Sequence, residues 1–221
     1  MINLLMNKNS SNQNPFVMYQ PDKYKNNDPV FIHKFIQQYP FATIVVQGES
    51  LLATHVPVLV NGDCDDFRLY AHIANHNPMF EVLESNMEML LIFKGPDAYI
   101  SSSWYEEPDI PTWDYSAVHI NAKVKIQTAE ELQESLHFLI KRFEEEQGDP
   151  MTVAKIPLKM WQENFSEITG FWLDPIKSVG IEKLHQGFKK KDIKNIASHL
   201  ERQSGCPMHQ LGELIKKDNK D

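Results

Sequence analysis

Three histidines stand out as residues that could do chemistry, because His55, His72 and His119 all lie in runs typical of β-strands. A β-barrel could bring such strands together, and imidazole serves both as a metal ligand and as an acid or base. No carboxylate or thiolate stands at ligand spacing beside them, so the sequence favours strand histidines that bond to backbone carbonyls. We therefore predict no metal site.

Two shorter segments offer other chemistry. The run Asn75-His76-Asn77 stands where a strand gives way to a helix, which suits either a phosphate or a plain capping turn. The run Cys206-Pro207-Met208-His209 offers soft ligands for haem, and a Cys-Pro step alone is weak support for haem. The sequence lacks the Gly-rich phosphate loop, the G-x-S-x-G elbow and the H-E-x-x-H motif.

Residues 95–120 read GPDAYISSSWYEEPDIPTWDYSAVHI and concentrate aromatic side chains between two apolar runs. Large rings on an irregular loop expose apolar area, which a ligand, a second subunit or the loop itself must cover. The stretch therefore indicates either a binding loop or a self-packed loop held by Pro108 and Pro111.

The elements that must position these residues follow from periodicity and caps. Helices are expected at residues 29–39, 78–84, 129–148, 157–165 and 192–202, and strands at 41–46, 51–60, 67–74, 87–93, 117–126, 168–173 and 176–181. The first three strands have the spacing of a meander. Antiparallel strands with helices between them predict an α+β, mainly β chain: a closed or split β-barrel with peripheral helices.

Composition limits the class of protein. The chain has 221 residues, 42% of them hydrophobic and 24% charged, and a net charge of −8, which argues against a large phosphate-binding surface. Its two cysteines imply no disulfide framework, and the start of the chain lacks the features of a signal peptide, so we expect a cytoplasmic protein. Residues 1–17 indicate a flexible extension, 18–203 one domain, and 204–221 a basic tail.

A set of motifs in order resembles the PaiB family of FMN-binding negative transcriptional regulators. The resemblance covers roughly residues 18–203 and rests on Met18-Tyr19-x-Pro21, Pro40-Phe41-Ala42-Thr43, Ala53-Thr54-His55-x-Pro57, His72-x-Ala74-x-x-Asn77-Pro78, Phe93-x-Gly95-Pro96, Ala98-Tyr99-Ile100-Ser101-x-Ser103-Trp104-Tyr105 and Pro111-Thr112-Trp113-x-Tyr115-x-Ala117-Val118-His119. It extends into Lys183-Leu184-His185-Gln186, where the family usually has serine in place of His185.

The resemblance implies an FMN-binding split barrel that forms a homodimer, with flavin at the subunit interface. Carried onto this chain, it gives three groups of flavin-binding residues: a strand along the ring edge (Thr54, His55, Val56, Pro57), a phosphate group (His72, Asn75, Asn77, Lys94) and flanking rings (Trp104, Trp113, Tyr115), with His119 behind them.

Three functions are compatible with the resemblance. The first is a dimeric FMN-binding regulator, for which a DNA partner is hard to explain because the chain is acidic and has no helix-turn-helix pattern. The second is an FMN-dependent oxidoreductase. The third is a haem-binding or haem-degrading protein that would use Cys206 or His209, and fold alone does not choose among the three.

Overall fold

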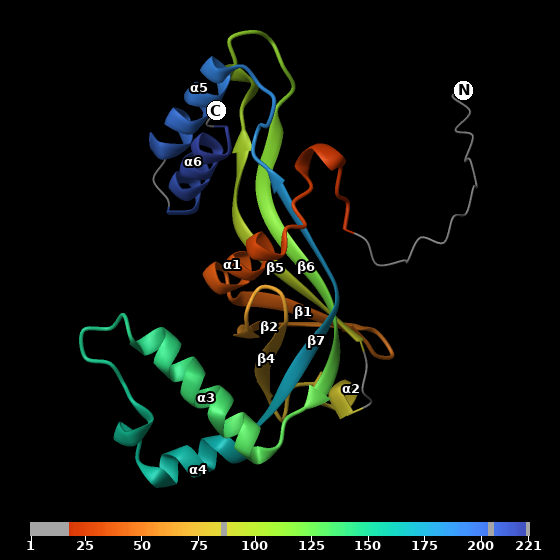
Figure 1. Ribbon diagram of the computed structural model, residues 1–221, viewed down its shortest axis with the longest axis vertical. Coiled ribbons are helices and arrows are strands. Elements are labelled where there is room, and N and C mark those ends of the chain that lie inside the picture. The colour runs from red at the N-terminus through yellow and green to blue at the C-terminus, as the bar shows by residue number, and fades with distance from the viewer. Residues whose placement is uncertain (1–17, 85–87, 203–205, 220–221) are drawn as a thin grey trace.

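The computed structural model describes residues 18–84, 88–202 and 206–219. Figure 1 shows a long twisted sheet with one helical pair near each end. The helices are α1 (Pro29–Gln38), α2 (Phe80–Glu84), α3 (Ala129–Glu144), α4 (Leu158–Ser166), α5 (Lys190–Arg202) and α6 (Cys206–Asp218). The strands are β1 (Phe41–Gln47), β2 (Leu51–Pro57), β3 (Leu59–Gly62), β4 (Phe67–Ala74), β5 (Glu88–Ile100), β6 (Thr112–Ile126) and β7 (Ile168–Lys183), with short 3-10 turns at Asp22–Tyr24, Ser102–Trp104 and Val153–Lys155.

The described strands form one seven-stranded antiparallel sheet in the order β2-β1-β5-β6-β7-β4-β3. The expected meander is confirmed, because the run 51–60 pairs with β1 through β2 and with β4 through β3. The other neighbours of β1 and β4 are β5 and β7. The run predicted as one strand, 51–60, is divided at Val58 into β2 and β3, which lie at the two ends of the sheet. One residue joins these ends, so the sheet curls into a barrel that is split between β2 and β3.

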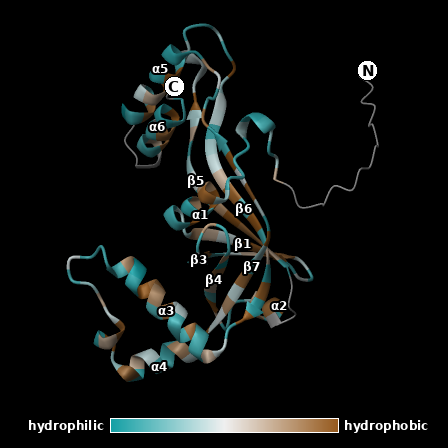
Figure 2. Cartoon of the chain, in the orientation of Figure 1, coloured by the Kyte–Doolittle hydropathy of each residue, from teal (hydrophilic) through white to brown (hydrophobic). Residues whose placement is uncertain are grey.

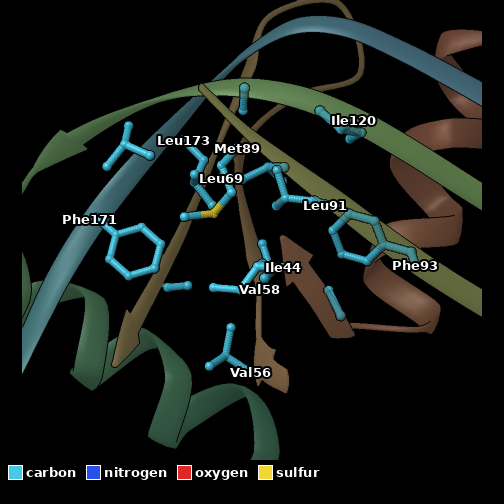
Figure 3. Close-up of a cluster of buried hydrophobic side chains, with 14 of the residues drawn as sticks. Ile44, Val56, Val58, Leu69, Met89, Leu91, Phe93, Ile120, Phe171 and Leu173 are labelled. Carbon is cyan, nitrogen blue, oxygen red and sulfur yellow. The ribbon is translucent and has the colours of Figure 1, made fainter. Parts of the chain in front are cut away.

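The barrel interior holds the larger of two hydrophobic cores. Side chains from several strands meet there, as Figure 3 shows for Leu69, Leu91, Phe171 and their neighbours. Helix α1 adds Ile32 and Ile36 to this core. Inward residues alternate with exposed ones along β1, which is the pattern of a strand with one face buried.

The aromatic stretch is mostly strand. Strand β5 continues to Ile100 and β6 begins at Thr112, so only residues 101–111 connect them. The expectation of a loop from Gly95 onward is therefore wrong, because the two segments pair from Tyr99↔Trp113 down to the barrel. Trp113 and Tyr115 consequently stand on a strand, where alternation fixes the face that each occupies.

The C-terminal region folds onto this extended hairpin. Helix α6 buries Leu211 and Ile215 completely against a second core, to which β5 contributes Ile100 and α5 contributes Ile196. The expected basic tail at 204–221 is wrong for residues 206–218, which form this helix. Figure 1 shows α5 and α6 together beside the upper part of β5.

Local signals located the starts of α1 and α3 correctly. Asp28 caps α1 with Pro29 at its first position, and Thr128 and Glu131 form the predicted capping box of α3. Hydrophobic and hydrophilic residues alternate along α3 and α4, which form an arm at the lower end of the sheet (Figure 2). The two strands expected around Asp174-Pro175 are one strand, β7, whose register shifts opposite Asn121/Ala122.

The segment before α1 is attached to β7 at one glycine. Gly180 accepts from the backbone N–H of Asn26 and donates its own N–H to the Asn27 side chain. A side chain at Gly180 would collide with the carbonyl oxygen of Asn26. Glycine therefore permits the close approach that holds residues 20–27 on the sheet.

Candidate functional site on the outer face of the sheet

One face of the sheet gathers several of the predicted residues, and we call it the outer face. It is the side of β2, β1, β5 and β6 whose side chains point away from both cores. Strand register places one row of it across four adjacent strands: His55, Thr43, Ile92 and His119. Further along β5 and β6 the same face carries Lys94, Asp97, Tyr99, Trp113 and Tyr115. Their immediate neighbours Ala98 and Asp114 are buried on the opposite side.

The outer face exposes large apolar side chains. Phe41 is 65% exposed, Leu51 73%, Tyr99 50% and Trp113 51%. The rings of Phe41 and His55 lie stacked with centroids 6.2 Å apart, and those of Tyr99 and Trp113 are also 6.2 Å apart. Such a patch is typical of a surface that a ligand or another subunit covers.

A polar group lies beside these rings. The Asp97 carboxylate accepts from the Trp113 indole Nε1–H at 2.8 Å and from the Lys94 ammonium at 2.6 Å. A β-bulge between Lys94 and Asp97 places both on the outer face. The sequence reasoning missed Asp97, although its position three residues after Lys94 in a strand with a proline could have indicated a bulge.

The two half-buried histidines His72 and His119 share an electrostatic property. Burial lowers the pKa of each imidazole below its usual value, because the protein interior disfavours the charged form. Each therefore favours the neutral form, which can accept or donate a hydrogen bond but brings no positive charge.

The predicted ring-edge strand divides between two faces. His55 is exposed on the outer face, whereas Val56 points into the barrel core. Thr54 faces inward beside Val56 and its hydroxyl accepts from the Asn77 side-chain amide at 3.5 Å. Thr54 and Asn77 are thus brought together where β2 approaches the turn after β4.

The four predicted phosphate residues do not form one cluster. Lys94 lies on β5, which β6 and β7 separate from His72 on β4. The Asn75 side chain donates to the Ser166 carbonyl and accepts from the Thr169 hydroxyl, and Asn77 caps the Met79 N–H. The plain capping turn therefore describes Asn77 better than a phosphate site does.

Trp104 lies apart from the other aromatic residues. Its ring stacks on His199 of α5, with centroids 4.9 Å apart and an angle of 3° between the planes. It packs against the second core instead of reaching the outer face. Its predicted contact with flavin stays a prediction that the single chain does not test.

The residues named for metal or haem are scattered. Among residues 18–84, 88–202 and 206–219, no group of three His, Cys, Asp or Glu side chains is placed to hold a metal ion. His209 is exposed on α6, 3.7 Å from Glu213. The Cys206 side chain lies outside the described part of the structure. In the part of the chain that is described, no helix has the length and apolarity to cross a membrane.

Comparison with known families identifies proteins that this chain is similar to. Residues 18–175 match the family described as "Putative FMN-binding domain". The chain is 31% identical over 201 residues to the protease synthase and sporulation protein PAI 2 of Bacillus subtilis, covering 90% of this chain and 97% of that protein. A protein of Saccharomyces cerevisiae is 35% identical over 83 residues, covering 35% of this chain and 49% of the relative.

Solved structures share the fold at low identity. An FAD- and haem-binding protein from Mycobacterium smegmatis superposes with a TM-score of 0.58 at 14% identity, covering 79% of this chain and 80% of that one. The flavocytochrome Anf3 of Azotobacter vinelandii gives 0.51 at 16% identity, covering 76% and 74%. The predicted split barrel is therefore confirmed, and the chain belongs to the PaiB family of FMN-binding domains.

Proposed function

We propose that this protein is an FMN-binding homodimer whose flavin lies on the outer face, covered by the second subunit. The observation that carries the proposal is the exposed aromatic surface of Phe41, Tyr99 and Trp113 beside a row of polar side chains. Bound FMN would supply electron-transfer chemistry, and the chain would supply binding and orientation.

The width and polarity of this surface suit the flat ring of a flavin. A flat heterocycle needs an apolar platform with a few placed polar groups, and the row from His55 to His119 spans three strand spacings, about 14 Å. Ile92 lies between the two histidines as a half-buried apolar residue. Tyr115 and Trp113 lie on the same face of β6, four and six residues along the strand from His119, and can stack on a ring.

Lys94 is the candidate that we propose for the phosphate, because it lies beside the aromatic residues of this face. Lys94 is 65% exposed and gives one of its three N–H groups to Asp97, so others can bond a phosphate oxygen. The Trp113 indole N–H and the Lys94 ammonium already converge on the carboxylate oxygens of Asp97. These two donors already bind one anionic group, the Asp97 carboxylate, which is the kind of contact that a phosphate oxygen would make.

A second copy is the cover that we propose for the apolar area. Phe41 lies on β1, and Leu51 lies on β2 at the edge of the sheet. Without a cover, the Phe41 ring and the Leu51 methyl groups would remain in water. Burial of such side chains contributes about 25 cal/mol per Å² of apolar surface removed from water. The same contact would close a pocket over the ring.

Replacing Trp113 with alanine should weaken FMN binding, because the variant loses a ring that can stack on the flavin. Loss of a stacking partner costs about 1–3 kcal/mol, which is roughly fivefold to 150-fold in Kd. Quenching of FMN fluorescence on titration measures this. The control is Phe138→Ala on α3, because Phe138 is 55% exposed and remote from the outer face. Equal affinities for Trp113→Ala and the unchanged protein would remove Trp113 from the site.

We propose that any regulatory role runs through the flavin or a protein partner instead of direct DNA reading. The net charge is −8, and lysines of the basic C-terminal region pair with carboxylates: Lys189 with Glu107, Lys191 with Glu106 and Lys216 with Glu201. These pairs reduce the positive field that DNA binding needs. A labelled upstream DNA fragment should migrate unchanged with the protein at moderate salt, and a clear shift would contradict this part of the proposal.

A further inference from the structure

A cavity lies on the other side of β6 from Trp113 and Tyr115. Its volume is about 200 Å³, and its lining includes Tyr24, Tyr105 and Phe188 as aromatic walls and Asp114, Lys183 and His185 as polar groups. An apolar cavity of about 150 Å³ is enough to hold benzene, so this one has room for a single ring with one polar substituent.

A chain of hydrogen bonds runs along the cavity. The Tyr105 hydroxyl lies 2.7 Å from His185 Nε2, and His185 Nδ1 bonds to Asp114 Oδ2. Asp114 is fully buried and His185 is 2% exposed. Because a carboxylate only accepts, His185 Nδ1 is the donor in its hydrogen bond to Asp114.

Tyr105 is a neutral phenol in this chain of hydrogen bonds. Burial, reinforced by the negative charge of Asp114 and further acidic side chains, raises the pKa of Tyr105 to about 12. The phenol therefore keeps its proton at neutral pH. This supports a role in holding His185 and Asp114 in place, and not a role as a base.

The network leaves one buried acceptor open. Among the described residues, Asp114 Oδ1 has no hydrogen-bond partner, and the nearest cation, Lys183 Nζ, is 4.0 Å away. The Lys183 ammonium donates to the Thr112 hydroxyl and to the Trp113 carbonyl, which leaves it a third N–H. A buried acceptor without a donor costs stability, so a donor from a ligand would relieve this cost.

The backbone at His185 supports a specific use of this imidazole. Its φ is +60°, in the left-handed region, which a residue other than glycine rarely adopts. Strain of this kind persists where surrounding contacts hold it, and here the His185 ring packs 4.6 Å from the Phe188 ring.

We propose that this cavity binds a small aromatic carboxamide. Its ring would lie among Tyr24, Tyr105 and Phe188, its N–H would donate to Asp114 Oδ1, and its carbonyl would accept the free N–H of Lys183. A carboxamide presents one donor and one acceptor side by side, which matches the adjacent acceptor and donor of Asp114 and Lys183. The site is separate from the proposed flavin surface and does not depend on it.

Benzamide is the probe that tests the site, titrated into the full chain and followed by isothermal calorimetry with ligand-observed NMR. Saturable binding is expected, and benzoate should bind much more weakly, because it lacks the donor and carries a charge that Asp114 repels. Asp114→Asn and Lys183→Met should each weaken benzamide binding roughly tenfold to a hundredfold, through loss of a charge-assisted hydrogen bond.

The control is Lys177→Met, because Lys177 lies on the same strand but outside the cavity lining. It should bind benzamide as the unchanged protein does. If Asp114→Asn fails to fold, as judged by circular dichroism, Lys183→Met decides alone. The proposal is overturned if benzamide shows no saturable binding, if benzoate binds as tightly, or if Lys183→Met retains full affinity.

Discussion

Replacing Phe41 with aspartate should turn the proposed dimer into a monomer and remove tight FMN binding with it. Phe41 is 65% exposed in the single chain and stacks on His55 at the edge of the outer face. A carboxylate there would lose its water when a second subunit covers the face, and an uncompensated buried charge costs about 3–5 kcal/mol. Dimerisation should weaken at least about a hundredfold.

The measurement is sedimentation equilibrium across a range of protein concentrations, paired with FMN titration of the same sample. Phe138→Asp is the matched control, because Phe138 is a phenylalanine of similar exposure on α3, away from the outer face. The control should behave as the unchanged protein. A Phe41→Asp variant that remains dimeric with unchanged FMN affinity would show that β1 and β2 do not form the interface.

Replacing Ile215 with alanine should destabilise the fold by about 2–5 kcal/mol. We expect this although Ile215 lies in the segment 204–221, which the sequence suggests is a tail. Its side chain is fully buried in the second core, beside Leu200 and Leu211. Loss of its methyl groups leaves a cavity that the packed helices α5 and α6 can only partly close.

Urea denaturation of the full chain gives the free energy of unfolding for this comparison. Lys217→Ala is the control on the same helix, because Lys217 is exposed and its loss should change stability by no more than about 0.5 kcal/mol. If Ile215→Ala and Lys217→Ala unfold at the same urea concentration, α6 does not contribute to the folded core.

The helices could be predicted because their signals are local. Asp28 followed by Pro29, and Thr128 followed by Glu131, carry their own capping chemistry, and the structure has both caps. The barrel class also followed from short antiparallel strands without βαβ units. Such patterns depend on residues only a few positions apart.

Strand partners could not be predicted in the same way, because pairing joins distant parts of the chain. β4 pairs on its other side with β7, about a hundred positions later in the chain, and the predicted meander gives no indication of this partner. Prolines and aromatic residues in 95–120 also suggest a loop, whereas hairpin pairing of β5 with β6 extends both strands through that stretch. Helix α6 packs against the second core, which includes Ile100 and Leu200, and these contacts join distant parts of the chain.

The sequence suggests which residue types belong to the candidate site, but it does not show which of those residues lie together. His55 and His119 are 64 positions apart in sequence, and only strand register places them in one row. The four residues that motif order assigns to the FMN phosphate are divided among β5, β4 and the turn after β4. Asp114 and His185 meet only because β6 pairs with the end of β7, so no spacing could reveal their contact.

Sedimentation velocity followed at the visible absorption of oxidised FMN tests the central claim most directly, because it reports bound flavin and particle size together. The outer-face proposal predicts that flavin absorbance sediments with the protein as a dimer, and that Trp113→Ala leaves more of it in the free, slowly sedimenting fraction. Flavin absorbance that stays entirely in the free fraction, or that travels with a monomer, would contradict the claim.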